Sequence, residues 1–347
     1  MDSIGYVYVH NNPAGPNSVS ILSRYSNGTL TPVGTTVIGG QGTGQFVDTQ
    51  GSLILDANRD RLFCVDEGSN QISVVAIEPH GVLKALSVSS SSGVRPLSIC
   101  YSRGRVYVVN QGDANHAANV AGFSMHSDGT LKPIPGSTQP LSAAQPDPGQ
   151  VQVDPDGDQL IVTEKGTNKI TSYTIHADGS LSSPTFTPSA GTTPFGFAFS
   201  PKDRSLFVVS DAGTGAATSY RLEGGNISVV SGPVGSPQTR AACWVAITKD
   251  GQYVYTGNAG SNTIATYNIG TDGKLTLQSS IGNNASSGFA TEIVLTPDNR
   301  YLYILSATFG SSPVSLGAFR VQSDGSLMAI GLTGISLPSS SSGIAVI

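Results

Sequence analysis

The sequence predicts an all-β protein, a seven-bladed β-propeller in which each blade has four strands and the first blade is closed by strands from both termini. Three observations predict this fold: a repeat of about 49 residues, a hairpin-turn signal within each repeat, and chain ends that resemble complementary parts of one repeat. Four strands at such a period are typical of a propeller blade. No linker interrupts the repeats, so we expect 1–347 to form one domain.

The period is set by a recurring pair of strands. The segment VDPDGDQLIVTEKGTNKITSY returns as ITKDGQYVYTGNAGSNTIATY, and weaker copies occur along the whole chain. The ends of the second strands align at seven polar residues: His10, Asp66, Asn110, Glu164, Asp211, Asn258 and Ser306. The steps between them are 56, 44, 54, 47, 47 and 48 residues, so seven copies account for the chain.

Each repeat closes with a tight hairpin, as in SYTIHADGSL and FRVQSDGSL, where the Gly supplies the positive φ that the turn requires. The first strand-like segment, GYVYVH, matches a second strand with no first strand before it. The segment SSGIAVI, after the last full repeat, supplies a lone apolar strand. We therefore expect both ends to share blade 1. The competing fold, a pair of β-sandwich domains, explains neither the period nor the ends.

Composition excludes several classes of function. The chain has 18 Lys and Arg against 23 Asp and Glu, for a net charge of −5, which argues against nucleic acid or a membrane as partner. The three cysteines show no CxxC spacing, which argues against a zinc site. Met1 leads directly into a strand-like segment, so we expect a cytoplasmic protein, or a secreted one if a leader has been removed.

Loops converge over the mouths of a propeller, and we expect a small-molecule site at one mouth. Among the second-strand ends, His10 and Glu164 are candidate acid–base residues, because neither is a favoured turn residue. His116, in the long loop QGDANHAANVAG, is a third candidate. Further candidates for substrate binding are Asp66, Asn110 and Lys165. Structural roles for these polar residues, as bonds to nearby backbone, remain an alternative.

A second set of candidates lies at the start of the first strands. Arg95 and Arg240 occupy matching positions three blades apart. We expect them either to face each other across the mouth and grip a carboxylate or phosphate, or to tie blades together by binding backbone carbonyls. Slightly further along the first strands, Gln150, Trp244 and Glu292 occupy equivalent positions of the repeat. Glu292 stands in the apolar strand FATEIVL, which makes it a candidate acid–base residue or the partner of an arginine.

We expect no cofactor and no metal, since no motif for either is present. A divalent ion in the channel, held by residues such as Glu292, Asn110, Asn258 and Asp66, is a weaker hypothesis because no loop shows a calcium-binding spacing.

The stretches DPDGDQLIVTEKGTNKITSYTIHADGSL and TKDGQYVYTGNAGSNTIATYNIGTDGKL resemble the seven-bladed lactonase propellers. That group includes cofactor-independent bacterial 6-phosphogluconolactonases and fungal 3-carboxy-cis,cis-muconate lactonizing enzymes. The resemblance implies a metal-free site at one mouth, with arginines holding carboxylates and a His and a Glu nearby. By position, Arg95, Arg240, His116 and Glu164 fit those roles.

Three functions stay open at this point. The first is a monomeric, cofactor-independent enzyme that opens or closes a small, carboxylated lactone. The second is a propeller for binding or surface display without catalysis. The third is a cyclase or isomerase acting on a natural-product intermediate in a more apolar pocket, lined by Phe195, Phe197, Trp244 and Phe289.

Overall fold

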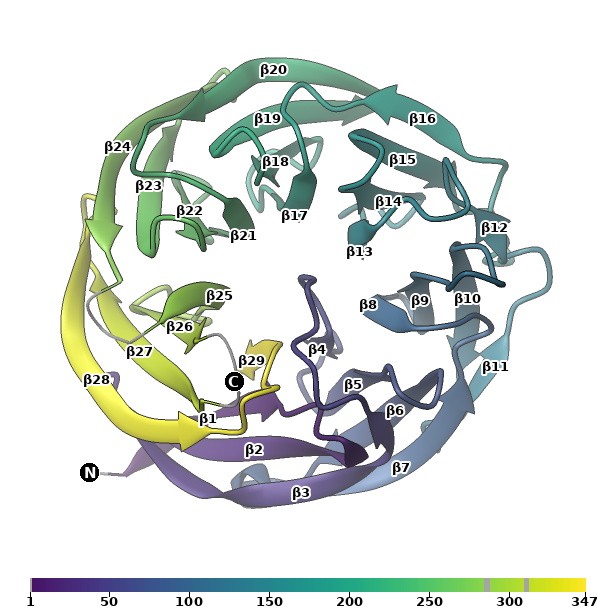
Figure 1. Cartoon of the computed structure of the whole chain (residues 1–347), viewed down its shortest axis with the longest axis horizontal. Coiled ribbons are helices and arrows are strands. Elements are labelled where there is room, and N and C mark those ends of the chain that lie inside the picture. The colour runs from purple at the N-terminus through teal and green to yellow at the C-terminus, as the bar shows by residue number, and fades with distance from the viewer. Residues whose placement is uncertain (1, 284–287, 309–311) are drawn as a thin grey trace.

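Seven β-sheets surround one central axis in the computed structural model, which describes residues 2–283, 288–308 and 312–347 (Figure 1). Each sheet is an antiparallel blade; in blades 2 to 7 the four main strands run in sequence order from the axis outward, and in blade 1 the last strand of the chain takes the innermost place. The predicted seven-bladed propeller with four-stranded blades is therefore confirmed, and blade 3 carries one additional short strand.

The strands of the first three blades are given from the axis outward. Blade 1 contains β29 (Ile344–Val346), β1 (Ser3–His10), β2 (Gly15–Tyr25) and β3 (Leu30–Gly42). Blade 2 contains β4 (Leu53–Leu55), β5 (Arg61–Asp66), β6 (Gln71–Ile77) and β7 (Leu83–Ser90), with the short 3-10 helix η1 (Pro79–Gly81). Blade 3 contains β8 (Pro96–Ser102), β9 (Arg105–Asn110), β10 (Asn119–Met125), β11 (Leu131–Pro133) and β12 (Gln139–Pro140).

The remaining four blades follow the same pattern. Blade 4 contains β13 (Pro148–Val153), β14 (Gln159–Glu164), β15 (Lys169–Thr174) and β16 (Thr185–Pro188). Blade 5 contains β17 (Pro194–Phe199), β18 (Leu206–Asp211), β19 (Ala216–Glu223) and β20 (Asn226–Gly235). Blade 6 contains β21 (Ala242–Ile247), β22 (Tyr253–Asn258), β23 (Thr263–Ile269) and β24 (Leu275–Gly282). Blade 7 contains β25 (Phe289–Leu295), β26 (Tyr301–Ala307), β27 (Val314–Val321) and β28 (Leu327–Leu337).

Both ends of the chain complete blade 1, as the sequence predicts. The inner strand β29 pairs antiparallel with β1, with Val346 opposite Val7 and Ile344 opposite Val9. The backbone N–H of His10 also donates to the carbonyl of Gly343, at 3.1 Å. This pairing covers the inner edge of β1, which would otherwise be open for association with another strand.

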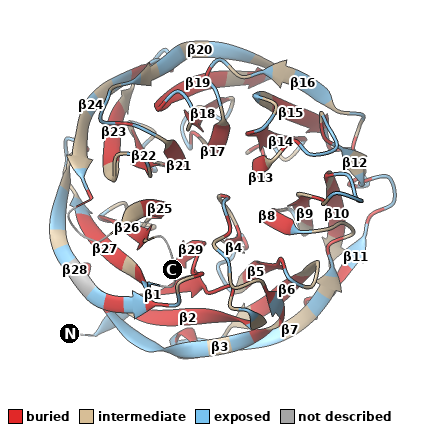
Figure 2. Ribbon diagram, in the orientation of Figure 1, coloured by how far each residue is buried: buried red, intermediate tan, exposed pale blue. Residues whose placement is uncertain are grey.

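The apolar core lies between neighbouring blades. Strands β14 and β18 are buried along their whole length, because both faces of each sheet pack against a neighbouring blade. For example, Phe63 and Val74 of blade 2 share one cluster with Ile99 and Val108 of blade 3. Buried residues are concentrated in the inner three strands of each blade. The outer strands face solvent, and in β20, for example, every residue is either exposed or half-buried (Figure 2). In the described part of the chain, no helix has the length and apolarity needed to cross a membrane.

The antiparallel strand order places the loops on two opposite faces of the ring. One face, which we call the long-loop face, carries the second-to-third-strand loops, such as 111–118, and the connections between blades, such as 91–95 and 236–241. The other face, which we call the turn face, carries the first-to-second-strand turns, such as 56–60 and 248–252.

One connection between blades extends to the axis. Residues 43–52, which we call the axial loop, precede β4 and reach the centre of the ring (Figure 1). Within this loop, the amide of Gln50 bonds to both backbone polar groups of Val245 in blade 6, at 2.9 Å each. The Gln50 backbone bonds to Gly149 of blade 4 and accepts from the Ser98 hydroxyl of blade 3, at 3.1 and 2.7 Å. The axial loop therefore spans the channel between blades.

Candidate functional site

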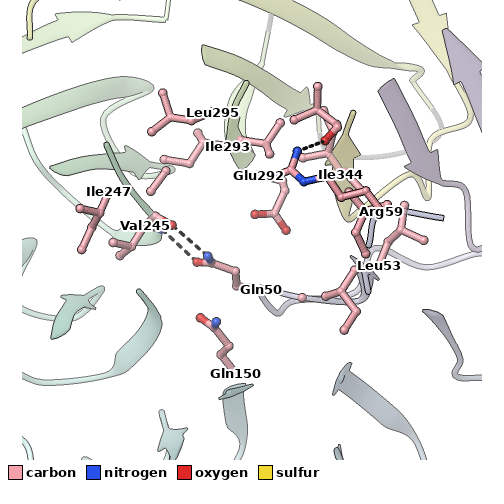
Figure 3. Close-up of a pocket in the computed structure, with 17 residues that line it drawn as sticks. Gln50, Leu53, Arg59, Gln150, Val245, Ile247, Glu292, Ile293, Leu295 and Ile344 are labelled. Carbon is pink, nitrogen blue, oxygen red and sulfur yellow. Dashed lines mark hydrogen bonds between the residues drawn. The ribbon is translucent and has the colours of Figure 1, made fainter. Parts of the chain in front are cut away.

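A cavity of about 370 Å³ lies on the axis, beneath the axial loop. Its walls come from the axial loop and the inner strands β4, β13, β21, β25 and β29, with Arg59 from the turn 56–60. The side chains of Glu292, Gln50 and Gln150 are directed into the same space (Figure 3). Its size falls within the range usual for small-molecule sites.

The cavity opens towards the turn face. In β25, Ile293 is buried while Val294 and Leu295 are half-buried, so exposure increases towards the end of the strand. The same gradient runs from Val245 to Ile247 in β21. Arg59, at the rim, is exposed. A ligand would therefore enter from the turn face and meet the axial loop at the inner end.

A shared irregularity of the inner strands positions the polar residues of the cavity. In blades 3 to 7 the pairing of the first and second strands shifts register near the start of the inner strand. Such bulges redirect side chains and are common beside functional sites. The residues that follow the shift are Ser98, Gln150, Phe197, Trp244 and Glu292.

Three of the residues that follow the register shift, Ser98, Gln150 and Trp244, make hydrogen bonds to backbone groups of the protein. The Ser98 hydroxyl donates to Gln50 O at 2.7 Å, and the Trp244 indole donates to Thr49 O at 3.0 Å. Gln150 Oε1 accepts from the backbone N–H of Phe197 at 2.6 Å. In the described part of the chain, the Glu292 carboxylate makes no hydrogen bond or ion pair with another side chain. Among these residues, Glu292 thus has a carboxylate that is free to act on a ligand.

The environment of Glu292 favours its neutral form. The residue is 4% exposed, and burial raises the pKa of its carboxyl well above the usual range, while the Ile293 amide offsets only part of that rise. A perturbed carboxyl that faces a cavity is a typical acid–base candidate.

Two other polar groups lie within reach of a ligand near Glu292. The Nε2 of Gln150 lies 3.4 Å from Gln152 Oε1, which is long for a hydrogen bond. The N–H groups of Gln150 are therefore able to donate to a ligand. Arg59 donates to Val346 O at 3.3 Å through Nη1 and lines the mouth of the cavity (Figure 3). The site therefore combines an acid–base group, an amide donor and a guanidinium at its rim.

Three candidates from the sequence lie on the long-loop face, where each already has a partner. Arg95 forms an ion pair with the buried Glu67 at 2.8 Å. The Nδ1 of His116 lies 2.8 Å from Asp113 on the exposed surface. Arg240 donates to Gly260 O at 2.6 Å. Both arginines are on the same face, as expected from their matching positions, and their roles in binding remain predictions.

The candidates at the second-strand ends are fully buried. His10 Nε2 lies 3.1 Å from Asn17 Oδ1, and burial lowers the pKa of His10 to about 4. Burial raises the pKa of Asp66 to about 6, and its carboxylate accepts from Ser73 at 2.7 Å. Asn110 donates to Ser91 O at 3.1 Å.

Glu164 and Lys165 lie where blade 4 meets the long-loop face. Glu164 accepts from Thr171 at 2.5 Å and from Thr167 at 2.6 Å. Lys165 forms ion pairs with Asp48 of the axial loop at 2.7 Å and with Asp147 at 3.3 Å. These contacts attach the axial loop to blade 4.

Of the predicted site residues, Glu292 and Gln150 share the axial cavity, and the other nine do not line it. Trp244 packs edge-on against Phe195, with ring centroids 5.2 Å apart, and so supports the axial loop from blade 6. Among the described residues, no group of three His, Cys, Asp or Glu side chains is arranged to hold a metal ion.

Gln50 and Arg59 were not predicted from the sequence. Gln50 belongs to a connection between blades, outside the repeated strands. Arg59 has a φ of 60° and lies in the turn between the first and second strands of blade 2. The equivalent positions in blades 4 and 6 are Gly157 and Gly251, which also have positive φ. An arginine in place of glycine at this turn was a signal available in the sequence, because it breaks the local preference.

The family profile described as "Lactonase, 7-bladed beta-propeller" matches residues 41–304. The chain belongs to this lactonase family. The match covers most of the repeats, including the axial loop and Glu292, and confirms the resemblance seen in the sequence. No curated protein gives a significant sequence match to this chain.

Solved structures share the fold at low sequence identity. A protein of Bacteroides fragilis provisionally named a 6-phosphogluconolactonase has a TM-score of 0.79 at 17% identity, covering 100% of this chain and 98% of its own. The periplasmic gluconolactonase PpgL of Pseudomonas aeruginosa has a TM-score of 0.79 at 17% identity, covering 99% of each chain. A hypothetical selenium-binding protein of Sulfolobus tokodaii reaches a TM-score of 0.76 at 9% identity, covering 100% of this chain and 94% of its own. At these identities the likeness concerns the fold alone.

Proposed function

We propose that the protein is a lactone hydrolase whose reaction takes place in the axial cavity, with Glu292 as the acid–base residue. The observation that carries this proposal is the Glu292 carboxyl, which is buried, has a raised pKa, and faces the cavity without a side-chain partner in the described chain. Membership of the lactonase family supports the reaction class.

Glu292 can move the one proton that the reaction requires. The ionised carboxylate takes a proton from water as the water oxygen bonds to the lactone carbonyl carbon. The ring C–O bond then breaks, and Glu292 returns the proton to the departing ring oxygen, which gives a hydroxy acid. Gln150 Nε2 donates to the carbonyl oxygen as negative charge develops there.

Two finer features come from the sequence and belong to this proposal. A lactone that carries a carboxylate would place that group near Arg59, whose guanidinium suits a carboxylate. Lactonization, the reverse direction, would use the same contacts in the opposite order.

The test is the rate of hydrolysis of a panel of aliphatic and sugar lactones, followed by acid release. For the best substrate of the panel, we expect Glu292→Gln to lower kcat/KM by about 100-fold or more, the usual effect of removing a general base. Glu223→Gln, the same change at an exposed residue of β19, is the matched control and should retain activity. Equal activity of both variants would exclude Glu292 from the reaction.

The pH dependence gives a second readout. Only the ionised carboxylate accepts a proton, so kcat/KM should rise with pH through the raised pKa of Glu292, after subtraction of spontaneous hydrolysis. The rise should be absent in Glu292→Gln. A wild-type profile that is flat from pH 5 to pH 8 would contradict the proposed role.

A further inference from the structure

A second cavity adjoins the axial cavity on the turn face. It has a volume of about 480 Å³ and is lined by the first-to-second-strand turns of blades 2, 5, 6 and 7 and by the ends of β21 and β25. We call it the entrance cavity, because it shares Arg59 with the axial cavity and lies where a ligand would enter. A molecule that reaches or leaves Glu292 from the turn face therefore passes these turns.

The charged side chains of the entrance cavity are both cations. Arg59 comes from the turn of blade 2 and Lys249 from the turn of blade 6, and both residues are exposed. None of the described residues that line this cavity is an Asp or a Glu. In a chain with a net charge of −5, a cavity lined by two cations and no acid favours a negatively charged ligand.

Both cations depart from the repeat. Arg59 stands where blades 4 and 6 have glycine, and its φ of 60° is one that favours glycine. Lys249 is the second residue of its turn, where three other blades have a proline: Pro155, Pro201 and Pro297. Two separate departures from the repeat bring the same charge to one cavity, which indicates a role in binding rather than in folding.

Both cations are available to a ligand. In the described part of the chain, neither forms an ion pair. Arg59 donates to Val346 O at 3.3 Å through Nη1, which leaves Nε and Nη2 as two donors on one edge of the guanidinium. A carboxylate can accept both of these hydrogen bonds at once.

The acidic residues nearest to these turns in sequence are used within the turns themselves. Asp250 accepts from the hydroxyl of Thr248 at 2.6 Å, and Asp298 accepts from the hydroxyl of Thr296 at 2.6 Å. Each carboxylate also accepts from the backbone N–H two residues later, at 3.1 Å. These bonds hold the carboxylates in their turns, so the two cations remain without an acidic partner.

Hydrolysis of a lactone creates a ligand of this charge. Water adds to the carbonyl carbon, the ring C–O bond breaks, and the acid that forms releases one proton, so that an uncharged lactone leaves as an anion. Inside the axial cavity this new carboxylate lies beside the carboxyl of Glu292, and two carboxylates in a buried site repel each other. The cations at the entrance attract the same group outward.

We propose that the entrance cavity is an oxyanion site, formed by Arg59 and Lys249, that binds the carboxylate of the hydroxy acid as it leaves the axial cavity. This proposal rests on the proposed function, because the ligand is the product of that reaction. It predicts that the product competes with the lactone for the entrance, since both use the same opening.

The first part of the test measures binding by titration calorimetry at pH 8. The ligands are 4-hydroxybutanoate and 4-hydroxybutanamide, which have the same length and differ in charge. We expect the acid to bind about tenfold more tightly than the amide, and this preference to shrink in high salt as charges are screened. Equal affinities of the two ligands for the wild type overturn the proposal.

The second part removes the cations with the residues that other blades use. The double variant Arg59→Gly, Lys249→Pro restores the repeat in both turns and should therefore fold, and we expect it to lose the preference for the acid. The matched control is Arg103→Gln, Lys202→Gln, because both residues are exposed in other turns of the same face and Arg103 also has a positive φ. The control should bind as the wild type does. Unchanged preference in the first variant overturns the proposal.

The third part separates the entrance from the reaction. For the best uncharged lactone, we expect the double variant to raise the inhibition constant of the hydroxy acid by about tenfold and to change kcat/KM by less than about twofold. Glu292→Gln should keep the preference for the acid. Loss of that preference in Glu292→Gln would place the anion in the axial cavity and overturn the proposal. If no lactone is hydrolysed while the acid still binds through the two cations, the oxyanion site stands and the proposed reaction fails.

Discussion

Buried acidic side chains at the second-strand ends connect neighbouring strands within each blade. Asp66, Glu164 and Asp211 each accept a hydrogen bond from a hydroxyl seven residues later, at 2.5 to 2.7 Å. The repeated spacing shows that these carboxyls have a structural role in the blade. Glu292 differs, because its carboxyl faces the cavity and no hydroxyl of the described chain bonds to it. Buried carboxyls thus occupy two different environments in this molecule.

The structural carboxyls make stability depend on pH. Burial raises the pKa of Asp211 from 3.8 to about 7, so the native state binds more protons than the unfolded state between these values. The contribution of Asp211 to stability is therefore present below pH 4 and is lost as the pH rises through 7, at about 1.4 kcal/mol per pKa unit.

Asp211→Asn should remove this dependence on pH, because the amide stays neutral. The side-chain oxygen of the asparagine can still accept the hydrogen bond that the Thr218 hydroxyl donates to Asp211. Urea unfolding at pH 5 and pH 8 measures the effect. We expect the wild type to lose more unfolding free energy than the variant between these two values. Parallel losses in the two proteins would show that Asp211 does not titrate in this range.

At the scale of elements, the axial loop closes one end of the cavity. Phe46 packs edge-on against Trp244 at 6.3 Å, Asp48 pairs with Lys165, and Gln50 bonds to Val245. These contacts join the loop to blades 4 and 6, so the depth of the cavity depends on a connection between blades.

Gln50→Ala should leave both backbone groups of Val245 without their partner. We expect the unfolding free energy to fall by about 1–3 kcal/mol and the Val245 amide to exchange its hydrogen faster. Gln45→Ala, at an exposed position of the same loop, is the control and should change neither quantity. An unchanged exchange rate at Val245 would show that the loop contributes no protection at the axis.

At the scale of the whole molecule, the ring is closed by a strand of three residues. Ile344, Ala345 and Val346 are buried, and they pair with β1 from the far end of the sequence. The stability of the ring therefore depends on a short segment whose loss exposes both the edge of β1 and the apolar faces beside it.

Deletion of residues 343–347 should lower the unfolding free energy by about 3–6 kcal/mol, from the lost burial of Ile344 and Val346. Addition of the peptide SSGIAVI should restore part of this stability by occupying the vacant strand position. A scrambled peptide of the same composition is the control. If the deletion leaves the melting temperature unchanged, the ring does not depend on β29.

The fold was predictable because the repeated strands and Asp-Gly turns can be recognised from short stretches of the sequence. Glu292 and Gln150 were also predictable, because alignment of the repeats places them at one register. Which connections reach the axis depends on the path of non-repeated loops, so Gln50 could not be found by alignment. For the same reason, the candidates on the long-loop face, such as Arg95 and Arg240, could not be placed relative to a cavity from spacing alone.

The most direct test of the central claim is a crystal structure of the protein with a γ-lactam analogue bound. The account predicts the ring in the axial cavity, with the carbonyl oxygen within hydrogen-bonding distance of Gln150 Nε2 and the ring beside Glu292. Density for the ring on the long-loop face, between Arg95 and Arg240, would contradict it.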